Sequence, residues 1–177
     1  MIDEAKRLTA LAQYHVMDSA PEEAFDDLAT IASHICNCPI ALVTLVDEKR
    51  QWFKARVGLE IRETPRDHSF CAHAIFEPEN LMVVTDATRD PRFARNPLVT
   101  ADPHIRFYAG APILTPGGDA LGTICVIDRA ARELAAGQRR ALLALGRQAS
   151  RLLELRRVSR QLAAALETVR ELQARSA

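Results

Sequence analysis

The 177-residue chain is long enough for one well-buried domain with an appendage and too short for two ordinary domains. Apolar residues make up 48% and charged residues 26%, a balance that excludes a chain disordered throughout. Lys plus Arg and Asp plus Glu number 23 each, so the net charge of zero provides no overall field to attract nucleic acid or an anionic membrane. We expect neither as a partner.

The N-terminal residues carry charge from Asp3 onward and lack the basic flank and apolar stretch of a secretory signal. No run of the sequence approaches the roughly eighteen apolar residues that a membrane-spanning helix needs. We therefore expect a cytoplasmic protein. In that compartment the four cysteines are expected to be free thiols and not a disulfide framework.

Helical spacing of apolar residues predicts two helices at the start of the chain. The first covers residues 3–15 and is followed by a turn at 18–21. The second has Pro21 and Glu22 in its first turn, where a missing N–H group and a negative charge are tolerated or favoured. The apolar side chains expected on its buried face are Phe25, Leu28, Ala32 and Ile35.

Two β-rich runs follow, at residues 40–46 and 51–57, and the turn residues between them predict a hairpin. The polar segment 60–68 contains a proline and is expected to be a loop. It leads into a short helix for which Ser69 is the expected N-terminal cap.

The next elements are a strand at 81–85 and a long loop at 86–103, and loops of such length usually have a function. Two further strands are predicted at 104–115 and 120–128, joined by a Pro-Gly-Gly-Asp turn. Pro112 cannot donate a ladder hydrogen bond, so an edge or a bulge is expected near it.

After Gly137 good helix formers continue to the end of the sequence, which predicts one long helix. We divide the chain into a domain, 1–136, and a C-terminal extension, 137–177. With Leu152 at heptad position a, apolar residues follow one seam for about three heptads and predict a coiled coil, which Ser159 and Gln173 weaken. A single amphipathic helix folded back along the domain is the alternative. The predicted dimerisation residues are Leu145, Leu152, Leu155, Leu162, Leu166 and Val169.

Several reactive side chains are candidates for a catalytic or metal site. Cys71 beside His73 suggests a thiol nucleophile, but no third residue at a recognisable spacing would orient the base. No Gly-rich phosphate loop occurs, because Gly117 and Gly118 lie between two strands. No metal is expected, because neither His/Cys group has the paired C-x-x-C spacing of a zinc site. The two groups are His34, Cys36 and Cys38, and His68, Cys71 and His73.

The order of helix, hairpin, SFCAHAI, LMVVTDA with the following DPRF, IRFYAGAPI and GTICVID resembles the GAF family. The likeness is strongest to the bacterial subgroup attached to histidine kinases and diguanylate cyclases, and it spans about residues 5–155. It implies an α+β fold with a central antiparallel sheet of five or six strands. The first and last helices would pack on one face and a ligand cavity would lie on the other. It also implies homodimerisation through the terminal helices, with an attached or separate histidine kinase or diguanylate cyclase as partner.

In the family the cavity is bounded by the short helix and the long loop before the penultimate strand. Carried onto this sequence, Arg92 and Arg106 would pair with an anionic ligand, and aromatic side chains would form apolar walls. Packing, or an internal ion pair with Asp86 or Asp90, is the alternative role. The implied ligand-binding residues are Ser69, Phe70, Cys71, Asp86, Arg92, Phe93, Arg106, Tyr108 and Thr123.

The sequence departs from three well-known branches of the family. Cys71 is followed by Ala72 and not by the histidine of bilin-binding members, the asparagine-rich signature of cyclic-nucleotide-binding members is absent, and the strand IRFYAGAP lacks the cysteine of free methionine sulfoxide reductases. We therefore expect a non-enzymatic sensory domain that binds an unidentified small molecule, with no cofactor assigned. The alternatives are a ligand-free dimerisation scaffold and a thiol enzyme like the sulfoxide reductases.

Overall fold

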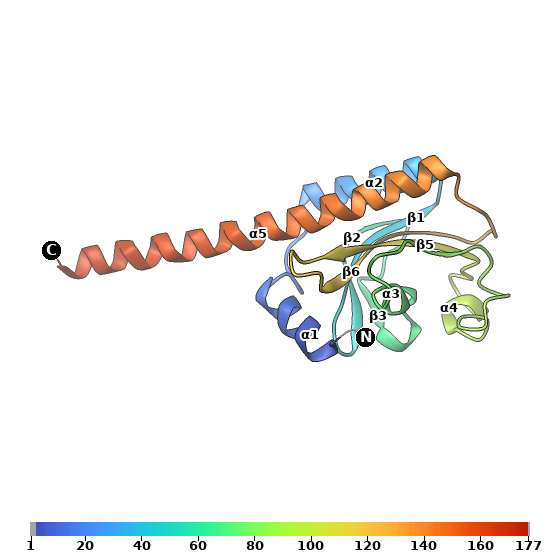
Figure 1. Ribbon diagram of the computed structural model, residues 1–177, viewed down its shortest axis with the longest axis horizontal. Coiled ribbons are helices and arrows are strands. Elements are labelled where there is room, and N and C mark those ends of the chain that lie inside the picture. The colour runs from blue at the N-terminus through green and yellow to red at the C-terminus, as the bar shows by residue number, and fades with distance from the viewer. Residues whose placement is uncertain (1–2, 177) are drawn as a thin grey trace.

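The computed structural model describes residues 3–176, which form a six-stranded antiparallel sheet with helices on both faces (Figure 1). The strand order is β3-β2-β1-β6-β5-β4. This confirms the expected α+β fold, with the larger of the two predicted strand numbers. The strands are β1 (Ile40–Val46), β2 (Arg50–Val57), β3 (Glu63–Pro65), β4 (Met82–Val84), β5 (Phe107–Leu114) and β6 (Ala120–Asp128).

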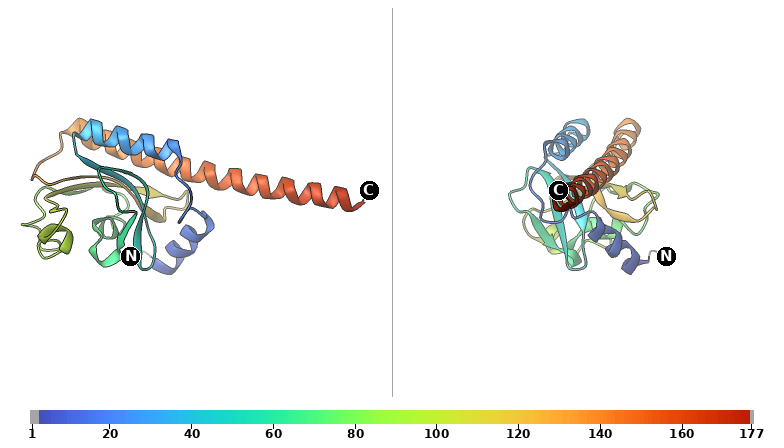
Figure 2. Two further views of the ribbon diagram at one scale, coloured as in Figure 1. Left: turned by 180° about the vertical axis from the view of Figure 1, so that it is seen from behind. Right: turned by 90° about the vertical axis from the view of Figure 1, so that its left-hand side faces the viewer.

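The helices α2 to α5 divide between the two faces of the sheet, and α1 lies at the end of β1 and the start of β6, where Arg7 donates to the Val46 carbonyl (Figure 1). The long helices α2 and α5 lie side by side on one face, and the short helices α3 and α4 lie on the other (Figures 1 and 2). Among the described residues, none of these helices has an apolar stretch sufficient to cross a bilayer. The helices are α1 (Glu4–Gln13), α2 (Glu23–Cys36), α3 (Phe70–Ala74), α4 (Pro97–Thr100) and α5 (Ala136–Ser176), with a 3₁₀ turn at Arg66–His68.

Alternation along the central strands builds a separate apolar core on each face. On β1, Ala41, Val43 and Leu45 pack under α2 and α5, whereas Ile40 and Leu42 face the α3 side. Every residue of β1 and of β6 is buried, because these two strands occupy the middle of the sheet and are covered on both faces. The ligand cavity was expected on the face opposite the last helix, and this is the face that carries α3.

The structure differs from the sequence-based expectations in several places, and the strand expected at 104–115 begins only at Phe107. Ile35 was expected on the buried face of α2 but is 43% exposed, because the helix buries Ala29 and Cys36 and turns Ile35 outward. The expected loop 60–68 contains β3 and the 3₁₀ turn, and three residues are too few for strand alternation to be visible. The long loop 86–103 contains α4, which is only one turn long.

Pro112 lies at the expected kind of position. It pairs with Thr123 of β6, but the ladder between β4 and β5 covers only Tyr108 to Gly110. On its other side, β5 is not paired with β4 at Pro112. The missing N–H group of the proline therefore costs no ladder hydrogen bond there.

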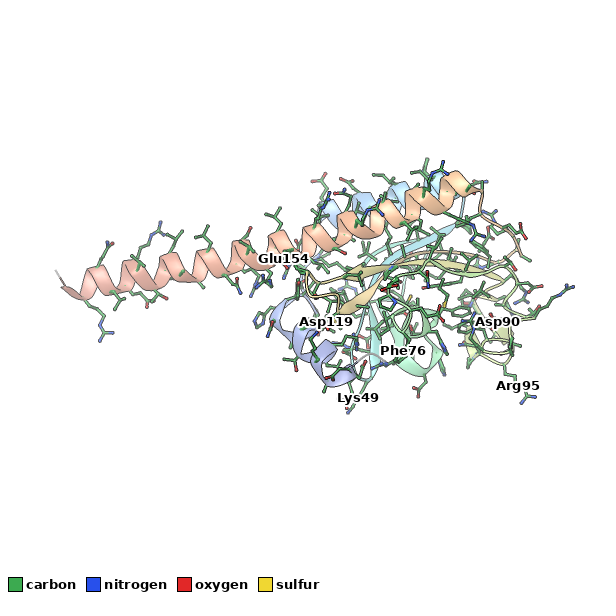
Figure 3. The ribbon with its side chains drawn as sticks, viewed as in Figure 1. Lys49, Phe76, Asp90, Arg95, Asp119 and Glu154 are labelled. Carbon is green, nitrogen blue, oxygen red and sulfur yellow. The ribbon has the colours of Figure 1, made fainter. Side chains whose placement is uncertain are left out.

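The helix α5 has two different halves. Its first half packs on the sheet through buried Leu142, Leu145, Ala149 and Leu153. From position 158 to position 175 every residue is exposed, and the helix extends away from the domain beyond Glu154 (Figure 3). The predicted division at 136/137 stays a prediction, since α5 begins at Ala136 and remains packed on the domain as far as Leu153.

Candidate functional site

Three aromatic side chains fill the space between α3 and the sheet. The hydroxyl of Ser69 accepts a hydrogen bond from the Ala72 amide at 2.9 Å and so caps α3, as expected. Because α3 begins at Phe70, this side chain packs against Phe93, with ring centroids 4.0 Å apart. It also packs against Tyr108, with ring centroids 5.3 Å apart. All three rings are at most 3% exposed. The predicted apolar walls thus pack on one another.

Thiols and hydroxyls lie behind these rings. The Cys71 sulfur is 3.8 Å from that of Cys125, and the Tyr108 hydroxyl donates to it at 3.3 Å. Burial raises the pKa of the Cys71 thiol, but hydrogen bonds from Cys125, Thr123 and Thr44 outweigh burial and lower it to about 6. Since Cys71 is only 1% exposed, its sulfur has no open path to a substrate in this conformation.

The three charged residues of the predicted site bind groups of the protein itself. Arg92 forms an ion pair with Asp90 at 2.7 Å, and its guanidinium lies 5.0 Å from the centre of the Phe93 ring. Arg106 donates to the Val99 carbonyl at 2.9 Å. Asp86 accepts from the Thr88 amide and hydroxyl and so shapes the start of the long loop. These contacts match the alternative role given above for the two arginines, which is packing or ion pairing within the protein.

A cavity of about 490 Å³ opens beside this cluster on the same face of the sheet. It lies between β1, β2 and β6 on one side and the segments 58–64 and 98–105 on the other. Its lining residues include none of the nine predicted ligand contacts, so their role in binding stays a prediction. The lining residues are Ile40, Leu42, Gln51, Phe53, Gly58, Leu59, Glu60, Ile61, Thr64, Leu98, Asp102, Pro103, Ile105, Ile127 and Arg129.

The cluster and the cavity share one hydrogen bond. Ser69, the cap of α3, donates from its hydroxyl to the side-chain carbonyl of Gln51, which lines the cavity. Gln51 faces Thr64 across the β2–β3 ladder, and both side chains are more than nine-tenths buried. The two sets of residues are therefore neighbouring parts of one face.

Sequence reasoning missed the cavity because it depends on the segment 58–64. The polar pattern of residues 60–68 predicts a loop, whereas Leu59 and Ile61 make the segment 58–64 one wall of the cavity. Two apolar residues among charged ones were the only local signal. Gly58 begins this wall with φ +76°, and a Cβ atom added there would collide with the carbonyl oxygen of Pro39.

A cluster of polar and charged side chains lies where α5 leaves the domain, and we name it the exit cluster. It comprises Tyr14, Glu22, Lys54, Glu154 and Arg156. Glu22 Oε1 accepts hydrogen bonds from Lys54 Nζ at 2.6 Å and from Arg156 Nε at 2.8 Å. Partial burial opposes ionisation of Glu22, but these two bonds outweigh it and lower the pKa of its carboxyl. The Lys54 side chain is fully buried, so Glu22 supplies its counter-charge.

Comparison with protein families gives a match to the GAF domain model over residues 20–166. Among characterised proteins, a cyclic di-GMP phosphodiesterase of Pseudomonas aeruginosa is 46% identical over 130 residues. The match covers 73% of this chain but only 22% of that enzyme. The chain therefore spans about a fifth of the length of this relative.

Two solved structures have the same fold. The GAF domain of an Acinetobacter phosphoenolpyruvate-protein phosphotransferase superposes with a TM-score of 0.63 at 16% identity, covering 87% of this chain and 95% of that one. The GAF domain of PixJ from Thermosynechococcus elongatus, in its blue-light-absorbing form, superposes with a TM-score of 0.65 at 15% identity. The match covers 94% of this chain and 98% of that one. At such low identity these likenesses establish the fold alone.

Proposed function

Because the chain belongs to the GAF domain family, we propose that it is a sensory domain of bacterial signal transduction that binds a small molecule and relays the signal through a paired α5. The observation that carries the proposal is the continuity of α5. One uninterrupted helix packs on the sheet with its first half and extends past the domain with its second. A movement of the sheet is thereby passed to the exposed half.

The exposed half supports pairing with a second copy. Leu155, Leu162, Leu166 and Val169 are between 49% and 62% exposed, although they are large apolar side chains. They recur at the heptad positions expected of a coiled coil, and a second copy would cover them. Leu145 and Leu152, the other two predicted dimerisation residues, belong to the packed half.

The exit cluster supports a route from the cavity to α5. Phe53 lines the cavity from β2, and the next residue, Lys54, points to the opposite face and binds Glu22. Glu22 in turn binds Arg156 on α5. A shift of β2 on ligand binding would change the support of the helix where it leaves the domain.

The alternative of a ligand-free scaffold has less support, because a cavity of about 490 Å³ is within the usual range for small-molecule sites. The relative named above supports a linked effector enzyme of cyclic di-GMP metabolism, and the family resemblance supports a histidine kinase as the other candidate.

Sedimentation equilibrium tests the relay half of the proposal. We expect the chain to dimerise, and Leu155→Glu with Leu162→Glu to raise the dissociation constant about tenfold or more. The control introduces two charges on other faces of the same helix, Gln161→Glu with Ala164→Glu, and should leave the constant nearly unchanged. A monomeric parent chain, or equal effects of the two double variants, would contradict the proposal.

A further inference from the structure

The cavity has an apolar floor and one polar side. Ile40 and Leu42 of β1, Phe53 of β2 and Ile127 of β6 make up the floor. The polar side is formed by Gln51 and Thr64, which are direct partners across the β2–β3 ladder and so present their side chains next to each other. The cavity is thus shaped for a molecule that has both kinds of surface.

The hydroxyl of Thr64 has no partner within the described residues. Thr64 is 8% exposed, and its Oγ1 is buried without a hydrogen bond. Buried polar groups are nearly always hydrogen-bonded, because leaving one unpaired is costly. An unpaired hydroxyl that lines a cavity is therefore explained most simply by a group that enters the cavity and pairs with it.

Charge is confined to the mouth of the cavity. The charged lining residues are Glu60, Asp102 and Arg129, and all three are exposed. Arg129 already donates from Nε to the Pro103 carbonyl at 3.0 Å. A phosphate or carboxylate placed against the apolar floor would lose its hydration without meeting an opposite charge.

We propose that the cavity takes a neutral, mainly apolar molecule with one hydrogen-bonding group, which pairs with the Thr64 hydroxyl. This inference rests on the proposed sensory function, since it names the ligand class for the same cavity. It excludes nucleotides and other anionic metabolites as occupants of the inner part. Gln51 positions the polar side through the bond from Ser69, which ties that side to α3.

Three related probes test this ligand class. Naphthalene is apolar, 1-naphthol adds one hydroxyl, and 1-naphthyl phosphate replaces the hydroxyl by an anion. Fluorescence titration of the whole chain should give a dissociation constant for 1-naphthol about fivefold lower than for naphthalene, as one hydrogen bond allows. The constant for 1-naphthyl phosphate should be at least about tenfold higher than for 1-naphthol.

Two variants assign that preference to the hydroxyl. In Thr64→Val the dissociation constant for naphthalene divided by that for 1-naphthol should fall to about one. Thr64→Ser keeps the hydroxyl and should therefore keep most of the parental preference for 1-naphthol. Without a probe, Thr64→Val should unfold at an equal or higher urea concentration than the parent, because it removes an unpaired buried hydroxyl. Thr30→Val, on the exposed surface of α2, is the control and should keep the parental ratio.

The possible failures are distinct. Preferred binding of 1-naphthyl phosphate, or an unchanged ratio in Thr64→Val, overturns the ligand class but leaves small-molecule sensing in place. Failure of all three probes to bind also overturns the inference. The dimerisation measurement with the α5 variants is independent of these titrations and decides the relay proposal separately.

Discussion

The hydroxyl of Tyr14 donates a 2.7 Å hydrogen bond to the carboxylate of Glu154, joining the end of α1 to the point where α5 leaves the domain. The two residues are 140 positions apart in the chain. Burial and the bond to Glu154 raise the pKa of Tyr14 to about 12, so the hydroxyl remains a donor at neutral pH. The exit of α5 is therefore fixed by the N-terminal segment as well as by the sheet.

Tyr14→Phe should weaken this junction. The variant keeps the ring and removes one hydrogen bond to a charged acceptor, so the free energy of unfolding should fall by about 1 kcal/mol. Urea denaturation followed by circular dichroism measures the change. Glu167→Gln, on the exposed half of α5, should change it by less than about 0.5 kcal/mol. Equal changes in the two variants would mean that the Tyr14–Glu154 bond contributes nothing.

Glu22→Gln should loosen α5 at its exit. The substitution removes the negative charge that Lys54 and Arg156 share, and it leaves the buried Lys54 without a counter-charge. Hydrogen exchange should speed up in the amides around Leu153, while those of β6 keep their protection. The neighbouring exposed residue offers a matched control, since Glu23→Gln removes the same charge outside the cluster. If Glu23→Gln has the same effect, net charge and not the shared acceptor is responsible.

Acid should destabilise the domain partly through Glu4. Hydrogen bonds from Arg7, together with those from Arg66, outweigh burial and lower the Glu4 pKa from 4.5 to about 2. A carboxyl whose pKa is lower in the folded state stabilises the fold above its unfolded pKa, and this contribution is lost as pH falls through the folded value. Between pH 4.5 and about 2 the parent should therefore lose more stability than Glu4→Gln. Parallel stability curves across that window would contradict this assignment.

Phe93→Ala should destabilise the protein by about 3 kcal/mol, because the ring is fully buried against Phe70. Ile61→Ala, at the mouth of the cavity with half its side chain exposed, should cost less than about 1 kcal/mol. Chemical denaturation of the two variants measures both changes. A small loss of stability in Phe93→Ala would show that the aromatic cluster is loosely packed. It would then favour the predicted role of these side chains as walls of a ligand site.

The predictable part of the fold rests on regular patterns. Strand alternation accounts for the two faces of β5, where Phe107 and Ala109 pack under α2 and α5 and Tyr108 lies on the α3 side. Ser69 was recognisable as a cap from its residue type alone. The long run of helix formers after Gly137 gave α5 almost to the residue.

The site was harder to predict because it depends on contacts between distant segments. The family resemblance pointed to α3 and the long loop, where Phe70 and Phe93 stack on each other. The cavity instead needs Leu59 and Ile61 to approach a segment around Pro103, more than forty positions later. Nothing in the periodicity of 58–64 specifies that approach. The exit cluster was missed for the same reason, since Glu22 and Arg156 lie 134 positions apart.

We propose above all that occupancy of the cavity changes the pairing of α5. The most direct measurement is the rate of disulfide cross-linking between chains that carry Leu166→Cys on the predicted seam, with and without saturating 1-naphthol. All four native cysteines are buried, so the introduced thiol is the reactive one. We expect the rate to change by about fivefold or more, and Ala164→Cys, on the opposite side of the helix, to give little cross-linking. An unchanged rate with the cavity saturated, or equal cross-linking at the two positions, would contradict this proposal.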